Sequence, residues 1–156
     1  IKPGQKERKK SVRYKLVPQE LEIKDKKVLI MDDSIVRGNT SREIVKMLRD
    51  FGADEVYFAS ACPPVQSPCF YGVDMPTKEE LIAGRMTVNE IEKYLQVDAL
   101  LYQEIKDLVE AVTRRGDHYI DKPCMACLDG NYIANDIDTK IIDQMSKQRA
   151  SHRNGV

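Results

Sequence analysis

The residues best suited to chemistry lie together, at positions 32–41. Two adjacent carboxylates come first, Asp32 and Asp33, which can accept hydrogen bonds from a vicinal diol and suit Mg²⁺ directly or through its waters. Gly38 then permits close backbone approach or a positive φ. Amide and hydroxyl groups follow at the start of a predicted helix, where a phosphate is favoured; they belong to Asn39, Thr40 and Ser41. A diol binder followed by a phosphate cradle predicts a ribose 5-phosphate site.

A simpler structural role is also open for these ten positions, namely an acidic turn followed by an ordinary helix cap. Thr40 and Glu43 have the spacing of a capping box, so Thr40 is the predicted N-cap. A cap, however, needs neither the second aspartate nor the Gly-Asn pair. The residue types therefore favour the ligand site over the bare cap.

The elements on either side would place this cluster at the edge of a parallel sheet. Residues 27–31 form a continuous apolar run, typical of a strand buried on both faces. A helix with one apolar face is expected next, ending at Gly52, and a second strand at residues 55–61. Strand, helix and strand within about 35 residues form a parallel crossover, so the fold class is α/β. Ligands of such sheets bind at the carboxyl ends of the strands.

The rest of the chain continues the same alternation. Two further capping boxes pair Thr77 with Glu80 and Thr87 with Glu90. They predict short helices near residues 78–83 and 88–95. A strand at 99–102 and an amphipathic helix from Ile105, closed by Gly116, complete the expected domain. Residues 1–116 are thus assigned to the main domain and 117–156 to a peripheral C-terminal segment.

Charge is balanced overall but unevenly placed. The 156 residues include 25 Lys or Arg and 25 Asp or Glu, which argues against a whole-surface binder of nucleic acid or membrane. Between Lys2 and Lys15, however, seven basic residues accompany a single acid, Glu7. This arm either binds an anion or is a solvated loop. No apolar run reaches the roughly 20 residues of a membrane span, and no signal-peptide pattern is present.

The chain has four cysteines, and without a secretory signal a disulfide framework is not expected. Cys124 and Cys127 form a C-x-x-C pair, which is compatible with metal binding, redox chemistry or chance. Cys69 is a candidate third ligand. Cys62 stands in a run of small residues and is expected to pack as a small hydrophobe.

Residues 28–41, V-L-I-M-D-D-S-I-V-R-G-N-T-S, closely resemble the phosphoribosyl-diphosphate-binding motif of type I phosphoribosyltransferases. The flanking stretches P-G-Q-K-E-R-K-K-S-V-R-Y-K-L, Y-F-A-S-A-C-P-P-V and Y-G-V-D-M-P-T-K-E-E-L-I-A are similar to the amidophosphoribosyltransferase family, and the resemblance extends from residue 1 to about 133. It implies a parallel-sheet type I phosphoribosyltransferase fold that is incomplete at its N-terminal side. Because the chain opens with Ile1 and not Met, we expect it to be the C-terminal part of a larger enzyme, inactive alone.

The resemblance also implies an activity. The family forms 5-phosphoribosylamine from phosphoribosyl diphosphate and ammonia, the first committed step of purine synthesis. The ammonia comes from glutamine, hydrolysed by an upstream glutaminase domain that this chain does not carry. Feedback by purine nucleotides, a homo-oligomer and a cytoplasmic location are further implications.

Roles follow for individual residues from the same resemblance. Asp32 and Asp33 would hold the ribose hydroxyls and Mg²⁺ and steady the positive charge that grows on the sugar. The 5-phosphate cradle would consist of Arg37, Gly38, Asn39 and Thr40. The basic arm resembles a flexible loop that folds over bound substrate, so its pyrophosphate contacts would be Arg8, Lys9, Lys10 and Arg13. The chain departs from the common pattern at Asn39, where Thr is usual, and at Tyr14, where a basic residue is usual.

Some family members carry a [4Fe–4S] cluster. Their cysteines lie in P-C-F-Y-G and C-x-A-C-x-x-G-x-Y stretches, which Cys69, Cys124 and Cys127 match here. The fourth ligand would lie outside this chain. The alternative is three reduced thiols in a relative without a cluster.

Two other classes compete with the enzyme. K-V-L-I-M-D-D-S also opens many response-regulator receiver domains, in which Asp74 would be the phospho-acceptor and Lys122-Pro123 the later Lys-Pro pair. Against this, residues 68–72 make a poor strand to precede an acceptor. The third class is a non-catalytic nucleotide-binding regulator on the same fold.

Overall fold

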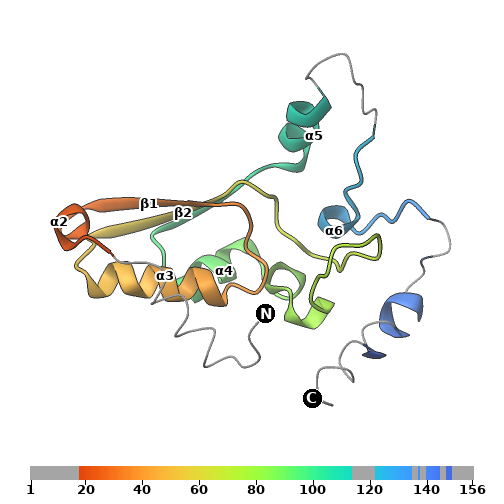
Figure 1. Ribbon diagram of the computed structural model, residues 1–156, viewed down its shortest axis with the longest axis horizontal. Coiled ribbons are helices and arrows are strands. Elements are labelled where there is room, and N and C mark those ends of the chain that lie inside the picture. Colours follow the sequence, from red (N-terminus) through yellow and green to blue (C-terminus); the bar gives the residue numbers. More distant parts are fainter. Residues whose placement is uncertain (1–17, 114–121, 135–136, 138–139, 145–146, 149–156) are drawn as a thin grey trace.

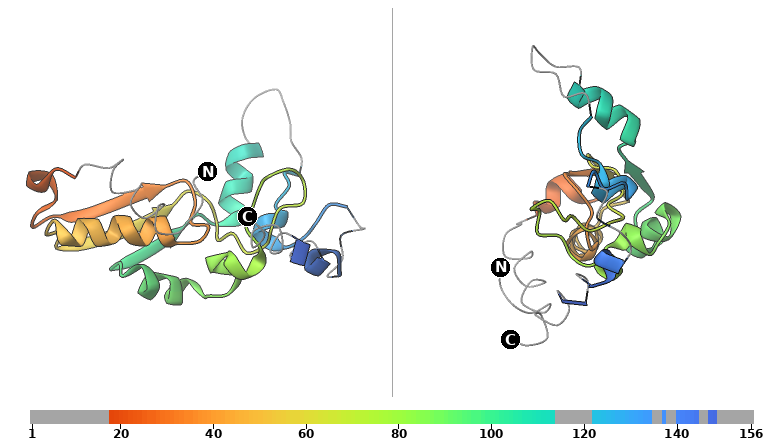
Figure 2. Two further views of the ribbon diagram at one scale, coloured as in Figure 1. Left: turned by 60° about the horizontal axis from the view of Figure 1, so that its bottom comes forward. Right: turned by 90° about the vertical axis from the view of Figure 1, so that its right-hand side faces the viewer.

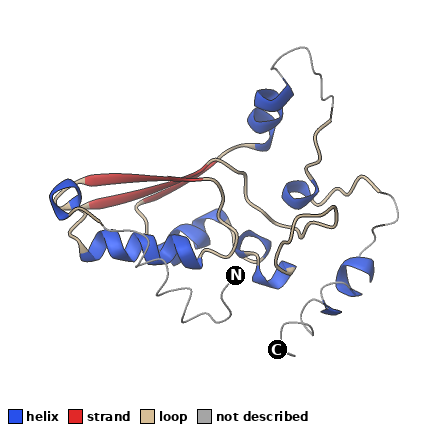
Figure 3. Cartoon of the chain, viewed as in Figure 1, coloured by secondary structure: helices blue, strands red, loops and turns tan. Residues whose placement is uncertain are grey.

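A three-stranded parallel sheet is the centre of the fold. The computed structural model describes residues 18–113, 122–134, 137, 140–144 and 147–148. Strand order is β1-β2-β3, with β1 at Lys27–Asp32, β2 at Glu55–Ser60 and β3 at Ala99–Tyr102 (Figures 1 and 3). Both neighbouring pairs are parallel, and Asp32 pairs with Ser60, which pairs with Tyr102. The predicted α/β class and all three predicted strands are confirmed.

Helices lie on one face of this sheet and beyond both of its ends (Figure 1). They are α2 (Glu20–Ile23), α3 (Asn39–Asp50), α4 (Val88–Leu95), α5 (Ile105–Thr113) and α6 (Ala126–Asp129), with 3₁₀ turns η1 (Lys78–Glu80) and η2 (Ile82–Gly84). The predicted helix at 88–95 is confirmed, whereas the one near 78–83 is two 3₁₀ turns. The short helix α6 was not predicted. No helix in the described residues is long and apolar enough to cross a membrane.

The main core fills the space between the sheet and the two helices α3 and α4, which lie on the same side of it (Figures 1 and 2). Alternate residues of β2 point into this core, and the ring of Phe58 is fully buried. Val45 and Leu48 come from α3, and Ile91 and Leu95 from α4. The apolar period of the helices therefore serves to bury one face of the sheet.

The opposite face of the sheet differs from expectation. Leu29 and Met31 of β1 are 56% and 73% exposed, and Leu101 of β3 is 55% exposed. The prediction that β1 is buried on both faces is therefore wrong for this structure. The physical reason is that no helix of the described part of the chain packs on that face (Figure 2).

The start of α3 also corrects the sequence prediction. Thr40 is not the N-cap, because the helix begins at Asn39 with Gly38 as its N-cap, and no side chain caps it. Arg42 N–H donates to the Gly38 carbonyl at 3.0 Å, which closes the first turn ahead of the expected cap. At the other end, Gly52 takes the predicted left-handed conformation, with φ +85°.

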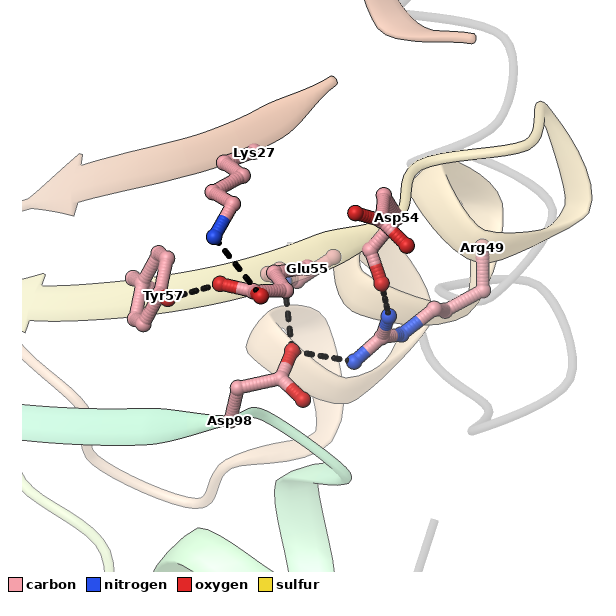
Figure 4. A network of polar contacts seen from close by, with 7 residues as sticks. Lys27, Arg49, Asp54, Glu55, Tyr57 and Asp98 are labelled. Carbon is pink, nitrogen blue, oxygen red and sulfur yellow. Dashed lines mark hydrogen bonds and ion pairs between the residues drawn. The ribbon is translucent and has the colours of Figure 1, made fainter. Parts of the chain in front are cut away.

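A polar network ties the amino ends of the strands together (Figure 4). The Asp98 carboxylate accepts from Val56 N–H at 2.6 Å and from the Arg49 guanidinium at 2.5 Å. Arg49 also donates to the Asp54 carbonyl at 2.7 Å, and Lys27 pairs with Glu55 across the strands at 2.9 Å. This network lies at the opposite end of the sheet from Asp32, so it does not involve the carboxyl ends of the strands.

Residues 122–134 pack on the loop that follows β2. A second small core joins Leu128 of α6 to Val65 and Leu81, all nearly fully buried. The Cys127 carbonyl accepts from both Gln66 N–H, at 2.9 Å, and Ser67 N–H, at 3.0 Å. The C-x-x-C stretch is thereby held beside the loop that leaves the sheet.

Candidate ribose-phosphate site

The two aspartates lie where the sequence places them, at the carboxyl end of β1. Asp32 is its last residue and is half-buried, while Asp33 is exposed in the bend that follows. Asp33 N–H donates to Asp32 Oδ1 at 2.9 Å, and the Ser34 hydroxyl donates to Asp33 Oδ1 at 3.2 Å. Both carboxylates retain acceptor lone pairs for a ligand.

The loop from β1 to α3 is anchored by apolar and backbone contacts. The side chain of Ile35 is 1% exposed within the main core. The Val36 carbonyl accepts from Ile82 N–H at 2.9 Å, which joins the loop to η2. These contacts hold the loop in place between the aspartates and the first turn of α3.

Gly38 is the point at which this loop turns into the helix. Its φ is +74°, and a Cβ there would lie 2.6 Å from Ile82 Cδ1 and 3.3 Å from Tyr94 Cε1. The left-handed conformation favours glycine, and a Cβ would also have to displace the terminal methyl of Ile82. The sequence prediction of a special backbone position at Gly38 is confirmed.

The amino end of α3 has the character of an anion site. No side chain caps it, and its first turn contains no acidic residue. By contrast, Thr87 caps α4 in a capping box with Glu90. The first N–H groups of a helix lack partners within the helix and carry its positive dipole end. Here they follow the aspartates by one short loop.

Arg37 has a different partner from the one expected of it. Its Nε and Nη2 atoms both donate to Glu80 Oε1, at 3.2 and 3.0 Å. The other oxygen of Glu80 accepts from Thr77 N–H at 3.2 Å in the predicted capping box. Arg37 therefore braces the loop against η1, and sequence reasoning missed Glu80 as its partner because they are 43 residues apart.

Tyr94 is a second residue that the sequence did not single out. Its hydroxyl lies 3.2 Å from Asn39 Oδ1, and the Arg42 guanidinium lies 4.8 Å from the centre of its ring. Tyr94 thus contacts both α3 residues and Gly38 from α4. A tyrosine within an amphipathic helix carries no sequence signal that would reveal this contact.

Two titratable side chains near the strand ends stay protonated at neutral pH. Burial raises the pKa of the Cys62 thiol, and the neighbouring Cys127 and Asp33 raise it further. Burial likewise raises the pKa of Tyr102 to about 12, with a smaller contribution from Cys62. A thiol with a raised pKa is a poor nucleophile, so Cys62 fits the predicted packing role.

The three cysteines predicted as cluster ligands lie on neighbouring segments. Cys69 Sγ accepts from Tyr71 N–H at 3.3 Å, and Cys124 is exposed. Burial raises the pKa of Cys127, and Cys69 and Cys124 are close enough to raise it further. Among the described residues, however, no three His, Cys, Asp or Glu side chains form a group that could hold a metal ion.

Other predicted residues fall elsewhere. The pyrophosphate contacts assigned to the basic arm, Arg8, Lys9, Lys10 and Arg13, lie outside the described residues. Asp74 is exposed in a loop between β2 and η1, not at the end of a strand. A receiver's acceptor must end a buried strand, so the placement of Asp74 does not favour the response-regulator alternative.

The site combines a parallel sheet, acidic residues at the end of β1 and, after one short loop, a helix that no side chain caps. The fold is α/β, of the type I phosphoribosyltransferase kind. No family model matches the sequence. The solved structure described as the allosteric regulatory enzyme of purine biosynthesis has a TM-score of 0.70 and 35% identity; the match covers 94% of this chain and 31% of that one. The glutamine phosphoribosylpyrophosphate amidotransferase from B. subtilis, complexed with ADP and GMP, has a TM-score of 0.66 and 37% identity. That match covers 91% of this chain and 32% of the other.

Sequence relatives carry the same name in several organisms. Amidophosphoribosyltransferase from Pseudomonas aeruginosa is 44% identical over 149 residues, which is 96% of this chain and 30% of the relative. The Escherichia coli enzyme is 42% identical over the same length, 29% of that relative. The Methanocaldococcus jannaschii enzyme is 46% identical over 132 residues, which is 85% of this chain and 27% of the relative. The chain is therefore a homologue of the amidophosphoribosyltransferases, and it spans about 30% of the length of these curated relatives.

Proposed function

We propose that this chain is the part of an amidophosphoribosyltransferase that binds the ribose 5-phosphate half of phosphoribosyl diphosphate. The observation that carries the proposal is the order of groups at the sheet edge, with Asp32 and Asp33 directly before a glycine turn and an uncapped helix. In the proposed reaction ammonia from glutamine attacks C1 of the ribose. The C1–O bond to pyrophosphate breaks, and 5-phosphoribosylamine forms as the first committed product of purine synthesis.

The carboxylates have two tasks in this proposal. They accept hydrogen bonds from the ribose hydroxyls, and their negative charge stabilises the cationic sugar as pyrophosphate departs. Two carboxylates also fit Mg²⁺, which commonly binds through one or two carboxylates, several waters and substrate phosphates. When bound, Mg²⁺ would neutralise the charge of the leaving pyrophosphate. Asp32 and Asp33 would hold and orient the metal ion.

The 5-phosphate is assigned to the amino end of α3. Gly38 turns the backbone into the helix, and Asn39 and Thr40 supply side-chain donors beside the first N–H groups of α3. Arg37 keeps a supporting task, because its ion pair with Glu80 fixes the loop that carries Gly38. The cradle is thus built before substrate arrives, which reduces the entropic cost of binding.

The remaining components of the enzyme are proposed from the resemblance to the family. We propose that the basic arm closes over pyrophosphate through Arg8, Lys9, Lys10 and Arg13, and that a glutaminase domain of the same protein supplies ammonia. The B. subtilis relative binds ADP and GMP, and feedback by purine nucleotides is proposed here on that basis. A homo-oligomer and a cytoplasmic location complete the proposal.

A [4Fe–4S] cluster on Cys69, Cys124 and Cys127 is a separate proposal, and no catalytic step depends on it. It requires the three thiols to draw together and a fourth ligand to come from elsewhere. Anaerobic purification of the full-length protein, with iron and labile-sulfide analysis, tests it directly. Four irons per chain that fall to none in Cys127→Ser would support the cluster, and iron-free protein would refute it.

The proposed function is tested with the full-length protein and Asp32→Asn. We expect phosphoribosylamine synthesis to fall at least a hundredfold while glutamine hydrolysis continues, because only the ribose site is changed. Asp107→Asn, an exposed carboxylate on α5, serves as the matched control and should leave both activities unchanged. Synthesis retained in Asp32→Asn would contradict the assignment. A wild-type protein that binds nucleotide but never turns over would favour the non-catalytic regulator.

A further inference from the structure

A hydrogen bond between two helices links the phosphate cradle to a residue with no assigned role. The Tyr94 hydroxyl of α4 donates to Oδ1 of Asn39, the first residue of α3, at 3.2 Å, and both side chains are half-buried. The ring of Tyr94 also passes beside Gly38, where a Cβ would lie 3.3 Å from Cε1. Arg42, on the next turn of α3, lies over the ring. One aromatic side chain therefore touches three positions at the amino end of α3.

The consequence lies in the orientation of the Asn39 amide. An amide group has an oxygen on one side and two N–H donors on the other, so a bond to Oδ1 decides where Nδ2 points. No described residue accepts a hydrogen bond from Nδ2. In this arrangement the Tyr94 hydroxyl occupies Oδ1, which leaves both Nδ2 donors of Asn39 available to an anion at the helix end.

The motif that residues 28–41 resemble commonly has threonine at the position of Asn39, and the two side chains would meet a phosphate differently. A threonine hydroxyl can rotate and donate to a phosphate without outside help. An asparagine that turned its Oδ1 toward the phosphate would instead repel it. The amide therefore gains from a partner that occupies the oxygen, and the position of Tyr94 on α4 supplies one.

We propose that Tyr94 is a positioning residue for binding of the 5-phosphate. Tyr94 acts by holding Asn39 with its Nδ2 donors toward the ligand. This inference rests on the proposed function of the site. It assigns Tyr94 and Asn39 as a functional pair, so that the effect of removing the hydroxyl depends on which residue occupies position 39.

The experiment uses the full-length protein with Tyr94→Phe, Asn39→Thr and the double variant. In the Asn39 background, Tyr94→Phe should raise the KM for phosphoribosyl diphosphate about fivefold, as expected for one lost orienting hydrogen bond, with kcat nearly unchanged. The inhibition constant of ribose 5-phosphate should rise by the same factor, because it shares the 5-phosphate. Inhibition by pyrophosphate should not change. In the Asn39→Thr background, whatever its own baseline, Tyr94→Phe should cause no further change.

The controls separate this role from packing between α3 and α4. Tyr57→Phe removes a phenolic hydroxyl at the opposite end of the sheet and should leave these constants unaltered. An equal KM increase in both backgrounds, or a lowered Tm with no change in KM, would overturn the pairing. Failure of the proposed function has a different signature, because Asp32→Asn would then still synthesise phosphoribosylamine whatever Tyr94 variants do.

Discussion

At the scale of single residues, Gly38 carries the strictest requirement in the site. Its left-handed backbone strains any side chain, and a Cβ would also displace the terminal methyl of the buried Ile82. We expect Gly38→Ala to destabilise the protein by about 3 kcal/mol, since the left-handed conformation costs about 1–2 kcal/mol and the overlap adds about 1–3 kcal/mol. The KM for phosphoribosyl diphosphate should rise at least tenfold because the cradle is displaced. Urea unfolding and steady-state kinetics measure the two effects.

Gly130 provides the matched control for this substitution. Its φ of +77° is nearly the same, but a Cβ there meets only Ser67 Oγ at 3.6 Å, an ordinary contact. Gly130→Ala should therefore cost only about 1–2 kcal/mol and leave the kinetics unchanged. Equal destabilisation at both positions, without a change in KM, would contradict the close packing around Gly38.

Tyr102 allows a prediction about pH. Its buried hydroxyl has no hydrogen-bond partner among the described residues, and burial raises its pKa to about 12. The unfolded chain loses this proton near pH 10, so Tyr102 contributes stability that is present below pH 10 and is lost as the pH rises toward 12. At pH 7, Tyr102→Phe should change the free energy of unfolding by between zero and about 1 kcal/mol in the stabilising direction. Above pH 10, the free energy of unfolding of the variant should fall less steeply than that of the wild type. Parallel alkaline unfolding curves for the two proteins would contradict the assignment.

The residues of the site divide into those that local sequence can predict and those that it cannot. Asp32, Asp33 and Gly38 could be proposed from the sequence, because adjacent residue types already indicate a diol, metal and turn site. Glu80 and Tyr94 were not found, because their partners lie 43 and 55 residues away and only the folded chain brings them together. Contacts of that kind depend on how α4 and η1 pack against α3.

At the scale of elements, two similar Thr-x-x-Glu patterns behave differently. Thr87 is a true N-cap, whose N–H donates to Glu90 Oε2 at 2.8 Å while its Oγ1 accepts from Glu90 N–H at 3.4 Å. Thr40 has the same spacing to Glu43 but lies inside the first turn of α3. The pattern alone cannot separate them, since the glycine turn at Gly38 starts α3 earlier than the pattern suggests.

This difference predicts opposite outcomes for the same substitution. Thr87→Ala should lower the free energy of unfolding by about 1 kcal/mol through loss of the cap, with kinetics unchanged. Thr40→Ala should leave the free energy of unfolding within about 0.5 kcal/mol, but it should raise the KM for phosphoribosyl diphosphate, because its hydroxyl faces the phosphate in the proposed site. Chemical denaturation and kinetics of both variants decide between them. If Thr40→Ala proves as destabilising as Thr87→Ala, the assignment of Gly38 as the cap is wrong.

At the scale of the whole molecule, the two faces of the sheet carry different information. The continuous apolar run of β1 predicted burial on both faces, and the described chain covers only one of them. Parallel sheets are normally covered on both sides. The sequence pattern was thus correct for a parallel sheet, whereas the described residues cannot supply the second layer. The matched relatives are about three times as long as this chain. In the full-length protein, we expect the additional polypeptide to cover the exposed face.

This expectation can be tested with Leu29→Gln made in two contexts. In the 156-residue chain Leu29 is 56% exposed, so the substitution should leave stability nearly unchanged while reducing self-association and dye binding to the apolar face. In the full-length protein the same substitution should lower the Tm by several degrees, because it would bury an amide without a partner. Leu21→Gln on α2, where the leucine is 90% exposed, is the matched control and should be silent in both contexts. A full-length Leu29→Gln protein with unchanged Tm would show that this sheet face stays open to solvent.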